Sequence, residues 1–148
     1  MLKSILQAYY DWLAEEPIEH NIIIDKYGNI WHTEGDENYV NPSDKIDLDG
    51  AIDIHNHIEP HSFSNDDLST MFKNKNTTFI LVDKDYIYTA QILKNFGTYK
   101  NYYAIGLDEA IKANLNEQSQ PHYSMLEMQK DGIVKYDRRP RKNSGEKV

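Results

Sequence analysis

Hydrophobic and polar residues alternate along the chain with either the helical or the strand period. The positions where the period changes predict where helices and strands begin and end. Apolar side chains recur at helical spacing over residues 2–16 and predict an amphipathic helix, which Pro17 prevents from continuing far. Two β-rich runs, NIIID and IWHT, flank a tight turn at Lys26–Asn29 and predict a hairpin, in which Gly28 takes a positive φ at no steric cost. A helix followed by a hairpin is therefore expected at the start of the chain.

A third strand is expected over Ala51–His55, after a turn-rich stretch that spans residues 34–50. That stretch contains at most a short strand around Tyr39 and Val40. Alternation along the third strand predicts one face with Ile52, Ile54 and Asn56 and another with Asp53, His55 and His57. The two histidines of this segment therefore share a face.

The rest of the chain predicts further helices and strands. Ser64 is typical of a helix N-cap, TTFILV and YIYTA predict a second pair of strands, residues 100–118 predict a helix, and GIVKY predicts an edge strand. Helices around a mostly antiparallel sheet predict an α+β, or mixed α/β, sandwich. We expect residues 1–136 to form a single domain and residues 137–148 to form a basic, disordered C-terminal tail.

Composition and charge narrow the classes of partner. The chain has 148 residues, 39% hydrophobic and 27% charged, so one soluble domain with one core is expected. The formal net charge is -8, and the tail carries five basic residues against two acidic ones, so the rest of the chain is still more acidic. An acidic body repels a phosphate backbone, which disfavours nucleic acid as a partner, although the basic tail is able to touch one.

The lack of cysteine limits the possible metal ligands, and the lack of a long apolar run or a signal peptide limits the expected location of the protein. The chain contains no cysteine, so any metal must be held by His, Asp or Glu. No apolar run approaches the roughly 18 residues that cross a bilayer, and the acidic start MLKSILQAYYDWLAEE differs from a signal peptide. We therefore expect a cytoplasmic protein without a membrane partner.

Three residues in the middle of the chain form a candidate zinc site. His55 and His57 are two residues apart near a strand end, so both imidazoles can reach one cation about 2 Å away. Asp67, in the first turn of the following helix, can fold back as a third, charged ligand. Three protein ligands leave a fourth position for water, as in catalytic zinc sites, and zinc lowers the pKa of that water to about 7. Zn²⁺ is therefore the expected cofactor.

A metal-activated water also needs a carboxylate that takes its proton without binding the metal. Glu19, at the entrance of the first strand, is the candidate general acid/base, with Glu16 and Glu34 behind it. Ser64 places a hydroxyl near the metal, where it can hydrogen-bond the oxyanion of a tetrahedral intermediate.

Taken in order, PIEHNIIIDKYGNI, AIDIHNH and SFSNDDL resemble the JAMM (MPN) metalloprotease family in its bacterial and phage form, over roughly half of the chain. By this resemblance His55, His57 and Asp67 match the zinc ligands, Glu19 matches the general acid/base, and Ser64 matches the oxyanion-stabilising serine. The family implies a cytidine-deaminase-like sandwich and zinc-dependent hydrolysis of peptide or isopeptide bonds. It also implies protein or peptide substrates, in some members conjugates of a ubiquitin-like modifier.

Simpler interpretations exist for each of these residues. Ser64 and Asp67 by themselves form a near capping box, and Asp66 stands in the same helical turn, where it can replace Asp67 as a ligand. Glu19 can be a surface charge at a strand edge. The remaining histidines are expected at the surface, with His61 close enough to compete for the metal: His20, His32, His61 and His122.

Other families share part of the pattern. IDIHNHIEP also resembles the opening of the PHP phosphoesterases and amidohydrolases, whose barrels need about 200 residues or more, and only ninety-one residues follow His57. The letters HNH do not indicate an HNH nuclease, whose motif residues are dispersed through a ββα fold. A catalytically inactive MPN-like binding or structural module is the main alternative to a hydrolase. A RadC-like relative with a loose link to DNA is disfavoured by the acidic charge.

Overall fold

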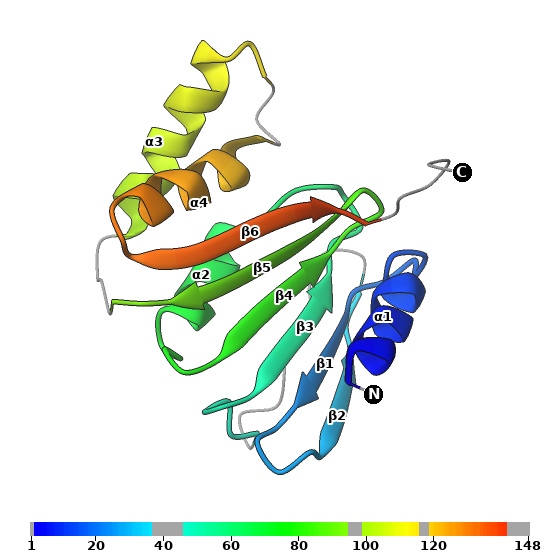
Figure 1. Cartoon of the computed structure of the whole chain (residues 1–148). Coiled ribbons are helices and arrows are strands. Elements are labelled where there is room, and N and C mark those ends of the chain that lie inside the picture. Colours follow the sequence, from blue (N-terminus) through cyan, green and yellow to red (C-terminus); the bar gives the residue numbers. More distant parts are fainter. Residues whose placement is uncertain (1, 37–45, 95–98, 116–118, 142–148) are drawn as a thin grey trace.

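A six-stranded sheet forms the centre of the computed structural model, which describes residues 2–36, 46–94, 99–115 and 119–141 (Figure 1). The strands lie side by side in the order β2-β1-β3-β4-β5-β6. In chain order the elements are α1 (Leu2–Leu13), β1 (His20–Ile24), β2 (Ile30–Glu34), β3 (Ile52–Asn56), α2 (Asn65–Met71), β4 (Thr78–Val82), β5 (Tyr86–Ile92), α3 (Tyr99–Lys112), α4 (Gln120–Lys130) and β6 (Val134–Pro140).

The sheet is antiparallel except at its middle, where β3 and β4 run parallel. A parallel pair needs a crossover connection, and α2 lies in the connection between these two strands. The α+β class and the mostly antiparallel sheet that the sequence predicts are therefore confirmed. This connection places the first turn of α2 next to the end of β3.

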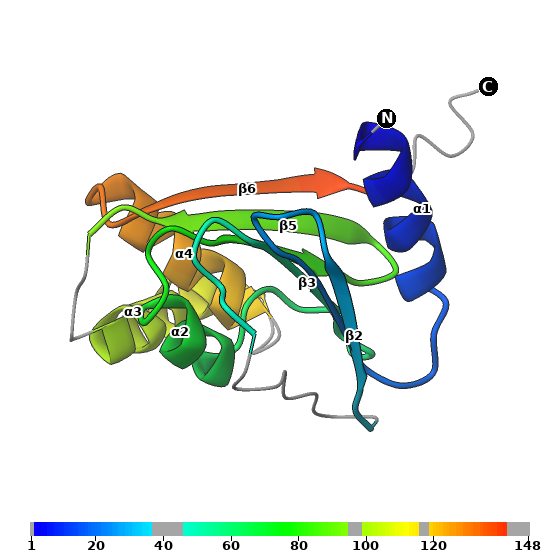
Figure 2. The ribbon, with the colours of Figure 1, turned by 90° about the horizontal axis from the view of Figure 1, so that it is seen from below.

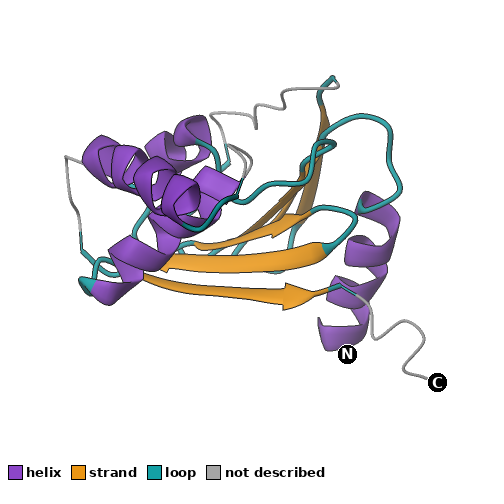
Figure 3. Ribbon diagram, turned by 90° about the horizontal axis from the view of Figure 1, so that it is seen from above, coloured by secondary structure: helices purple, strands orange, loops and turns teal. Residues whose placement is uncertain are grey.

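The two faces of the sheet are covered by different helices. Figures 2 and 3 show α2, α3 and α4 gathered on one side of the sheet, with α1 apart from them. On the α1 face, Leu13 packs in one apolar cluster with Ile22, Ile54 and other sheet residues. On the opposite face, Phe63 and Leu68 pack with Leu81, Tyr88 and residues of α4. Removing these side chains from water on both faces is the main force that holds the layers together.

Most predicted elements are confirmed, with shifts at their ends. The hairpin turn is present with Gly28 at φ 87°, and Ser64 is the N-cap of α2. The first helix ends at Leu13 instead of residue 16, and the late helix ends at Lys112 instead of residue 118. The short strand expected around Tyr39 and Val40 falls outside the described residues.

One helix, α4, is missing from the elements that the sequence pattern predicts. It packs against α3, and its buried residues are Pro121, Ser124, Met125 and Met128. Because only two of these four side chains are strongly apolar, the helical period is weak in the sequence. Gly106 lets α3 approach this helix closely, since a Cβ at that position would lie 2.6 Å from the Gln120 carbonyl oxygen.

The predicted boundary of the C-terminal tail is wrong. β6 continues to Pro140, so residues 137–140 form part of an edge strand paired with β5. The guanidinium of Arg138 lies over the Tyr86 ring, 4.3 Å from its centroid. Arg141, with a side chain only 7% exposed, lies 3.5 Å from a carboxylate oxygen of Glu15, just after α1. The basic residues therefore contact the fold, and residues 142–148 lie outside the described part of the chain.

Candidate metal centre

His55 and His57 lie at the end of β3, in the middle of the sheet. His55 stands between Asn21 of β1 and Leu81 of β4, and the backbone N–H of His57 donates to the carbonyl oxygen of Val82 at 3.0 Å. Alternation turns both imidazoles toward the face that α2, α3 and α4 cover, as the sequence predicts. Both residues are buried, with 8% and 7% of their surface exposed.

Asp67 reaches both histidines from the first turn of α2. Its Oδ1 lies 3.2 Å from His55 Nε2, and its Oδ2 lies 3.1 Å from His57 Nε2. Two ligand atoms about 2.1 Å from one tetrahedral zinc ion are about 3.4 Å apart, so these separations are close to those of a shared ion. One ligand atom from each of the three residues lies within 4.8 Å of the others.

A capping box fixes the carboxylate of Asp67 in this place. Ser64 Oγ accepts a hydrogen bond from the Asp67 backbone N–H at 3.1 Å, and Asp67 Oδ2 accepts one from the Ser64 backbone N–H at 2.8 Å. Asp67 is thus both the N3 residue of the capping box and the candidate ligand, and the two interpretations of Ser64-x-x-Asp67 do not exclude each other. Asp66 is exposed and is not part of the three-residue group.

Hydrogen bonds also orient the two imidazoles for a metal. His57 Nδ1 lies 3.0 Å from the carbonyl oxygen of His61, and because a carbonyl only accepts, Nδ1 carries the proton. This leaves the Nε2 lone pair of the neutral ring directed at Asp67, the tautomer that metal-binding histidines use. His55 Nε2 is buried, and no atom of the described residues forms a well-aligned hydrogen bond with it. These donor atoms fit a divalent cation.

Without a metal, the site holds a proton instead. Burial is the largest single influence on the pKa of His55 and would lower it, but the charge and hydrogen bond of Asp67 together with the charges of Asp53 and Glu19 outweigh burial and raise the pKa to about 9. Burial is likewise the largest single influence on the pKa of Asp67 and would raise it, but the charges and hydrogen bonds of His55 and His57 together outweigh burial and hold this pKa well below the usual range. The metal-free site at neutral pH is therefore an imidazolium–carboxylate pair, and a cation must displace the proton to bind.

Glu19 lies next to this site and is buried, with 7% of its surface exposed. Burial raises the pKa of its carboxyl group, and the charges of His57 and His55 oppose that rise. A carboxylate with an elevated pKa beside a candidate metal site is suited to take and return a proton near neutral pH. The structure therefore places the predicted acid/base residue close to the predicted ligands.

Asn56 holds the segment that carries Glu19, a role that the sequence pattern does not reveal. Its Oδ1 accepts a hydrogen bond from the His20 backbone N–H at 2.7 Å. Its amide nitrogen donates to the carbonyl oxygens of Leu13 and Ile18, at 3.3 and 3.0 Å. Asn56 is 1% exposed and belongs to the same strand as His55, so it ties the loop before β1 directly to the strand of the ligands.

The remaining histidines only partly follow the expectation of surface positions. His20 is 2% exposed, so that expectation is wrong for it, whereas His32 is exposed. The His61 ring lies beside His57 at a tilt of 45°, with centroids 4.2 Å apart, but its Nδ1 lies 2.8 Å from the Ser62 carbonyl oxygen and it stands outside the three-residue group. His122 is partly buried, and its Nδ1 lies 2.7 Å from the Tyr136 hydroxyl.

Glu16 and Glu34, the alternatives to Glu19, lie elsewhere. Glu16 Oε1 is 2.9 Å from His20 Nε2, and Glu34 stands opposite His20 across the β1–β2 hairpin. Strand alternation puts His20 on the α1 face, away from the face that carries His55. Glu19 is therefore the carboxylate of these three that adjoins the candidate metal centre.

The chain matches no protein-family model, and no curated protein or solved structure is significantly similar to it. The resemblance to the JAMM family thus rests on the motif residues themselves. Within the described ranges, no helix combines the length and the apolar character that a membrane crossing requires.

Replacing Asp67 or its neighbour Asp66 tests which of the two carboxylates binds the metal. Asp67→Asn removes the charged ligand and is expected to weaken zinc binding at least about 100-fold, measured by calorimetric titration of metal-free protein at pH 7. Asp66→Asn is the matched control, because it removes the same charge from the same helical turn, and it is expected to change the affinity by less than about fivefold. Equal effects of the two substitutions would contradict the assignment of Asp67.

The metal-free protein should lose stability as the pH rises from 6.5 to 9.5. The pKa of His55 is raised in the folded state, so its contribution is complete below about 6.5, the pKa of an unfolded histidine, and is lost as the pH passes about 9. The loss is at most on the order of 3 kcal/mol. Denaturant unfolding in excess chelator measures it, and Asp67→Asn should flatten the dependence whereas Asp66→Asn keeps it. An unchanged slope in Asp67→Asn would show that Asp67 does not hold this proton.

Proposed function

We propose that this protein is a zinc-dependent hydrolase of peptide or isopeptide bonds, of the JAMM type. The observation that carries the proposal is the convergence of His55, His57 and Asp67 beside the buried carboxyl group of Glu19. Three protein ligands are the number found in catalytic zinc sites, whereas structural sites use four. The JAMM resemblance also supports a catalytic zinc site, because the Glu, the His-x-His pair and the Asp of the family motif follow one another in the same order along this chain.

Each residue of the site has a role in amide hydrolysis. His55, His57 and Asp67 would hold a zinc ion, which would supply Lewis acidity and a water of lowered pKa. Glu19 takes the proton of the attacking water and returns it to the leaving amine, for which its raised pKa is suited. The bond from the Asp67 backbone N–H to Ser64 Oγ uses an oxygen lone pair, so the hydroxyl hydrogen can donate to the developing oxyanion.

Substrate class follows from the family resemblance. JAMM enzymes cleave peptide bonds or the isopeptide bonds of lysine side chains, so we propose a protein or peptide substrate, including conjugates of a ubiquitin-like modifier. The acidic net charge of -8 supports a protein partner over a nucleic acid. The combination of a sheet with helices on both faces is also the kind of architecture that the resemblance implies.

Activity of the zinc-loaded protein tests the proposal. We expect zinc-dependent cleavage in a panel of proteome-derived peptides and lysine-linked ubiquitin-like conjugates, followed by mass spectrometry. Glu19→Gln should lower kcat at least about 100-fold while zinc content stays that of the wild type, because only the proton carrier is lost. Glu59→Gln is the matched control, since Glu59 is exposed two residues after His57, and it should keep wild-type activity.

One result would contradict the role of Glu19, and another would contradict the hydrolase itself. Undiminished cleavage by Glu19→Gln would show that Glu19 is not the proton carrier. Stoichiometric zinc without cleavage of any member of the panel would favour the inactive MPN-like binding or structural module.

A further inference from the structure

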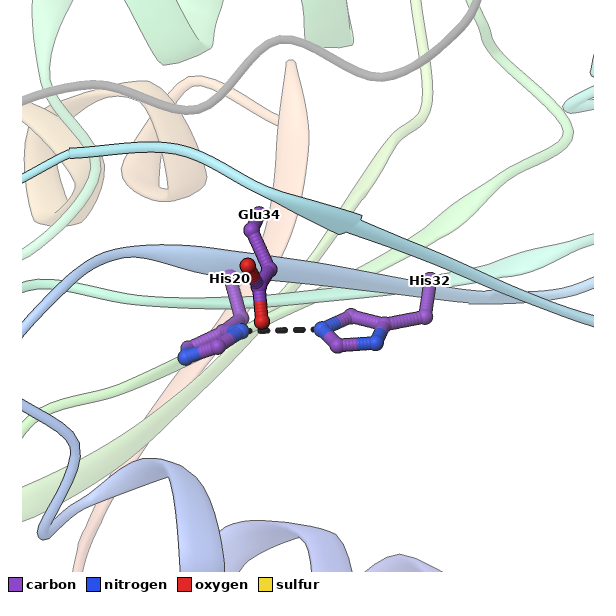
Figure 4. Close-up of side chains that lie close together, drawn as sticks. All are labelled: His20, His32 and Glu34. Carbon is purple, nitrogen blue, oxygen red and sulfur yellow. Dashed lines mark hydrogen bonds between the residues drawn. The ribbon is translucent and has the colours of Figure 1, made fainter.

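A second group of metal-ligating side chains lies at the open end of the β1–β2 hairpin. His20 is the first residue of β1 and pairs with Glu34, the last residue of β2. His32 stands two residues before Glu34, so strand alternation puts all three side chains on the same face of the sheet. Figure 4 shows the Glu34 carboxylate beside the line that joins the two imidazole rings.

The ligand atoms of this group lie close together, although the two imidazole nitrogens are at hydrogen-bond distance and would have to separate to about 3.4 Å to share one tetrahedral ion. His20 Nδ1 lies 2.8 Å from His32 Nε2, and one oxygen of Glu34 lies within 4.8 Å of both ligand nitrogens. The two rings are stacked at a tilt of 27°, with centroids 5.1 Å apart. Two nitrogen lone pairs at 2.8 Å repel each other unless a proton or a metal ion lies between them.

Glu16 decides which nitrogen of His20 faces the group. Its Oε1 lies 2.9 Å from His20 Nε2, and an ionised carboxylate only accepts, so Nε2 carries the proton. The lone pair of His20 therefore sits on Nδ1, the atom that faces His32. A carboxylate that accepts from the distal nitrogen of a histidine is the usual outer partner of a metal-binding imidazole.

The group formed by His20, His32 and Glu34 is buried at His20 and exposed to solvent at His32 and Glu34. His20 is 2% exposed, whereas His32 and Glu34 are exposed, so an ion can enter from solvent. The Trp12 ring of α1 covers the two imidazoles, with centroids 4.7 Å from His20 and 5.7 Å from His32. The burial of His20 beneath Trp12 lowers the local dielectric on that side and strengthens the attraction between a cation and its ligands.

We propose that His20 Nδ1, His32 Nε2 and the Glu34 carboxylate form a second site for a divalent transition metal, with Glu16 orienting His20. Two imidazoles and one carboxylate suit zinc and its neighbours in the first transition row, and they disfavour calcium and magnesium. The site lies on the α1 face of the sheet, opposite His55, so it is separate from the candidate hydrolytic centre.

Metal at this site would fix the strand end that carries Glu19. Glu19 directly precedes His20, and its backbone N–H and carbonyl bond to the Asp36 carbonyl and the Gly35 N–H, at 2.7 and 2.8 Å. An ion that joins β1 to β2 at His20 and Glu34 closes the same end of the hairpin. The second site thereby acts as a structural clamp behind the proposed acid/base residue.

Zinc stoichiometry tests the second site. Metal-free full-length protein is titrated with zinc by calorimetry at pH 7, for the wild type, His32→Gln, Asp67→Asn and the double variant. We expect two, one, one and no bound equivalents, because each substitution removes a ligand and weakens its own site at least about 100-fold. His32 is exposed, so this substitution leaves the fold intact, and circular dichroism checks that it does. Thr33→Val, on the opposite face of the same strand, is the matched control and should bind two equivalents.

Imidazole nitrogen chemical shifts give a second readout. Zinc should shift Nδ1 of His20 and Nε2 of His32, and the shifts at His20 should disappear in His32→Gln. The proposal is overturned if His32→Gln binds as many equivalents as the wild type, or if Asp67→Asn alone abolishes all zinc binding. A hydrogen bond between His20 and His32 without metal affinity would give that last result. Because Asp67→Asn isolates the second site, the outcome does not depend on whether hydrolysis is found.

Discussion

The carboxylate of Asp67 joins α2 to β3, and the candidate metal centre depends on this contact. One oxygen faces His55, while the other faces His57 and accepts the Ser64 backbone N–H. Because the capping box fixes the carboxylate at the helix start, no flexible side chain must be ordered when a metal binds. The parallel pairing of β3 with β4 makes this geometry possible, since the crossover returns the chain to the end of β3 through α2.

Charge compensation governs both faces of the sheet near this point. On one face, the partly buried Asp67 is neutralised by protonated His55, and a divalent cation can take over that role. On the other face, Glu16 and Glu34 flank the pair of imidazoles at His20 and His32. The start of β1 links the two faces, because Glu19 beside the candidate metal centre directly precedes His20 on the α1 face. Metal occupancy on the α1 face can therefore influence the position of Glu19.

Local patterns in the sequence were sufficient to predict the candidate centre. The alternation around His55 and His57 and the capping residues Ser64 and Asp67 are each encoded within a few positions, and the structure places them as expected. The α+β class follows from the same periodic runs. Glu19 was harder to assign, because its place beside the histidines depends on the bonds that Asn56 makes across the sheet.

Features that depend on distant segments were not predictable in the same way. His20 is buried because Trp12 and Glu16 close over it, and no property of the HNIII run reveals this contact. α4 has too few apolar positions to stand out from a polar segment. The basic residues after Tyr136 resemble a solvated tail in the sequence. In the structure, however, Arg138 packs over the Tyr86 ring, and Arg141 lies near the carboxylates of Asp11 and Glu15.

Anomalous diffraction at the zinc edge, from crystals grown with zinc, tests most directly whether the three residues bind a common ion. The account predicts a peak about 2.0–2.2 Å from His55 Nε2, His57 Nε2 and an oxygen of Asp67. Well-ordered side chains of these residues without a peak between them, in crystals where zinc is bound elsewhere on the chain, would contradict it.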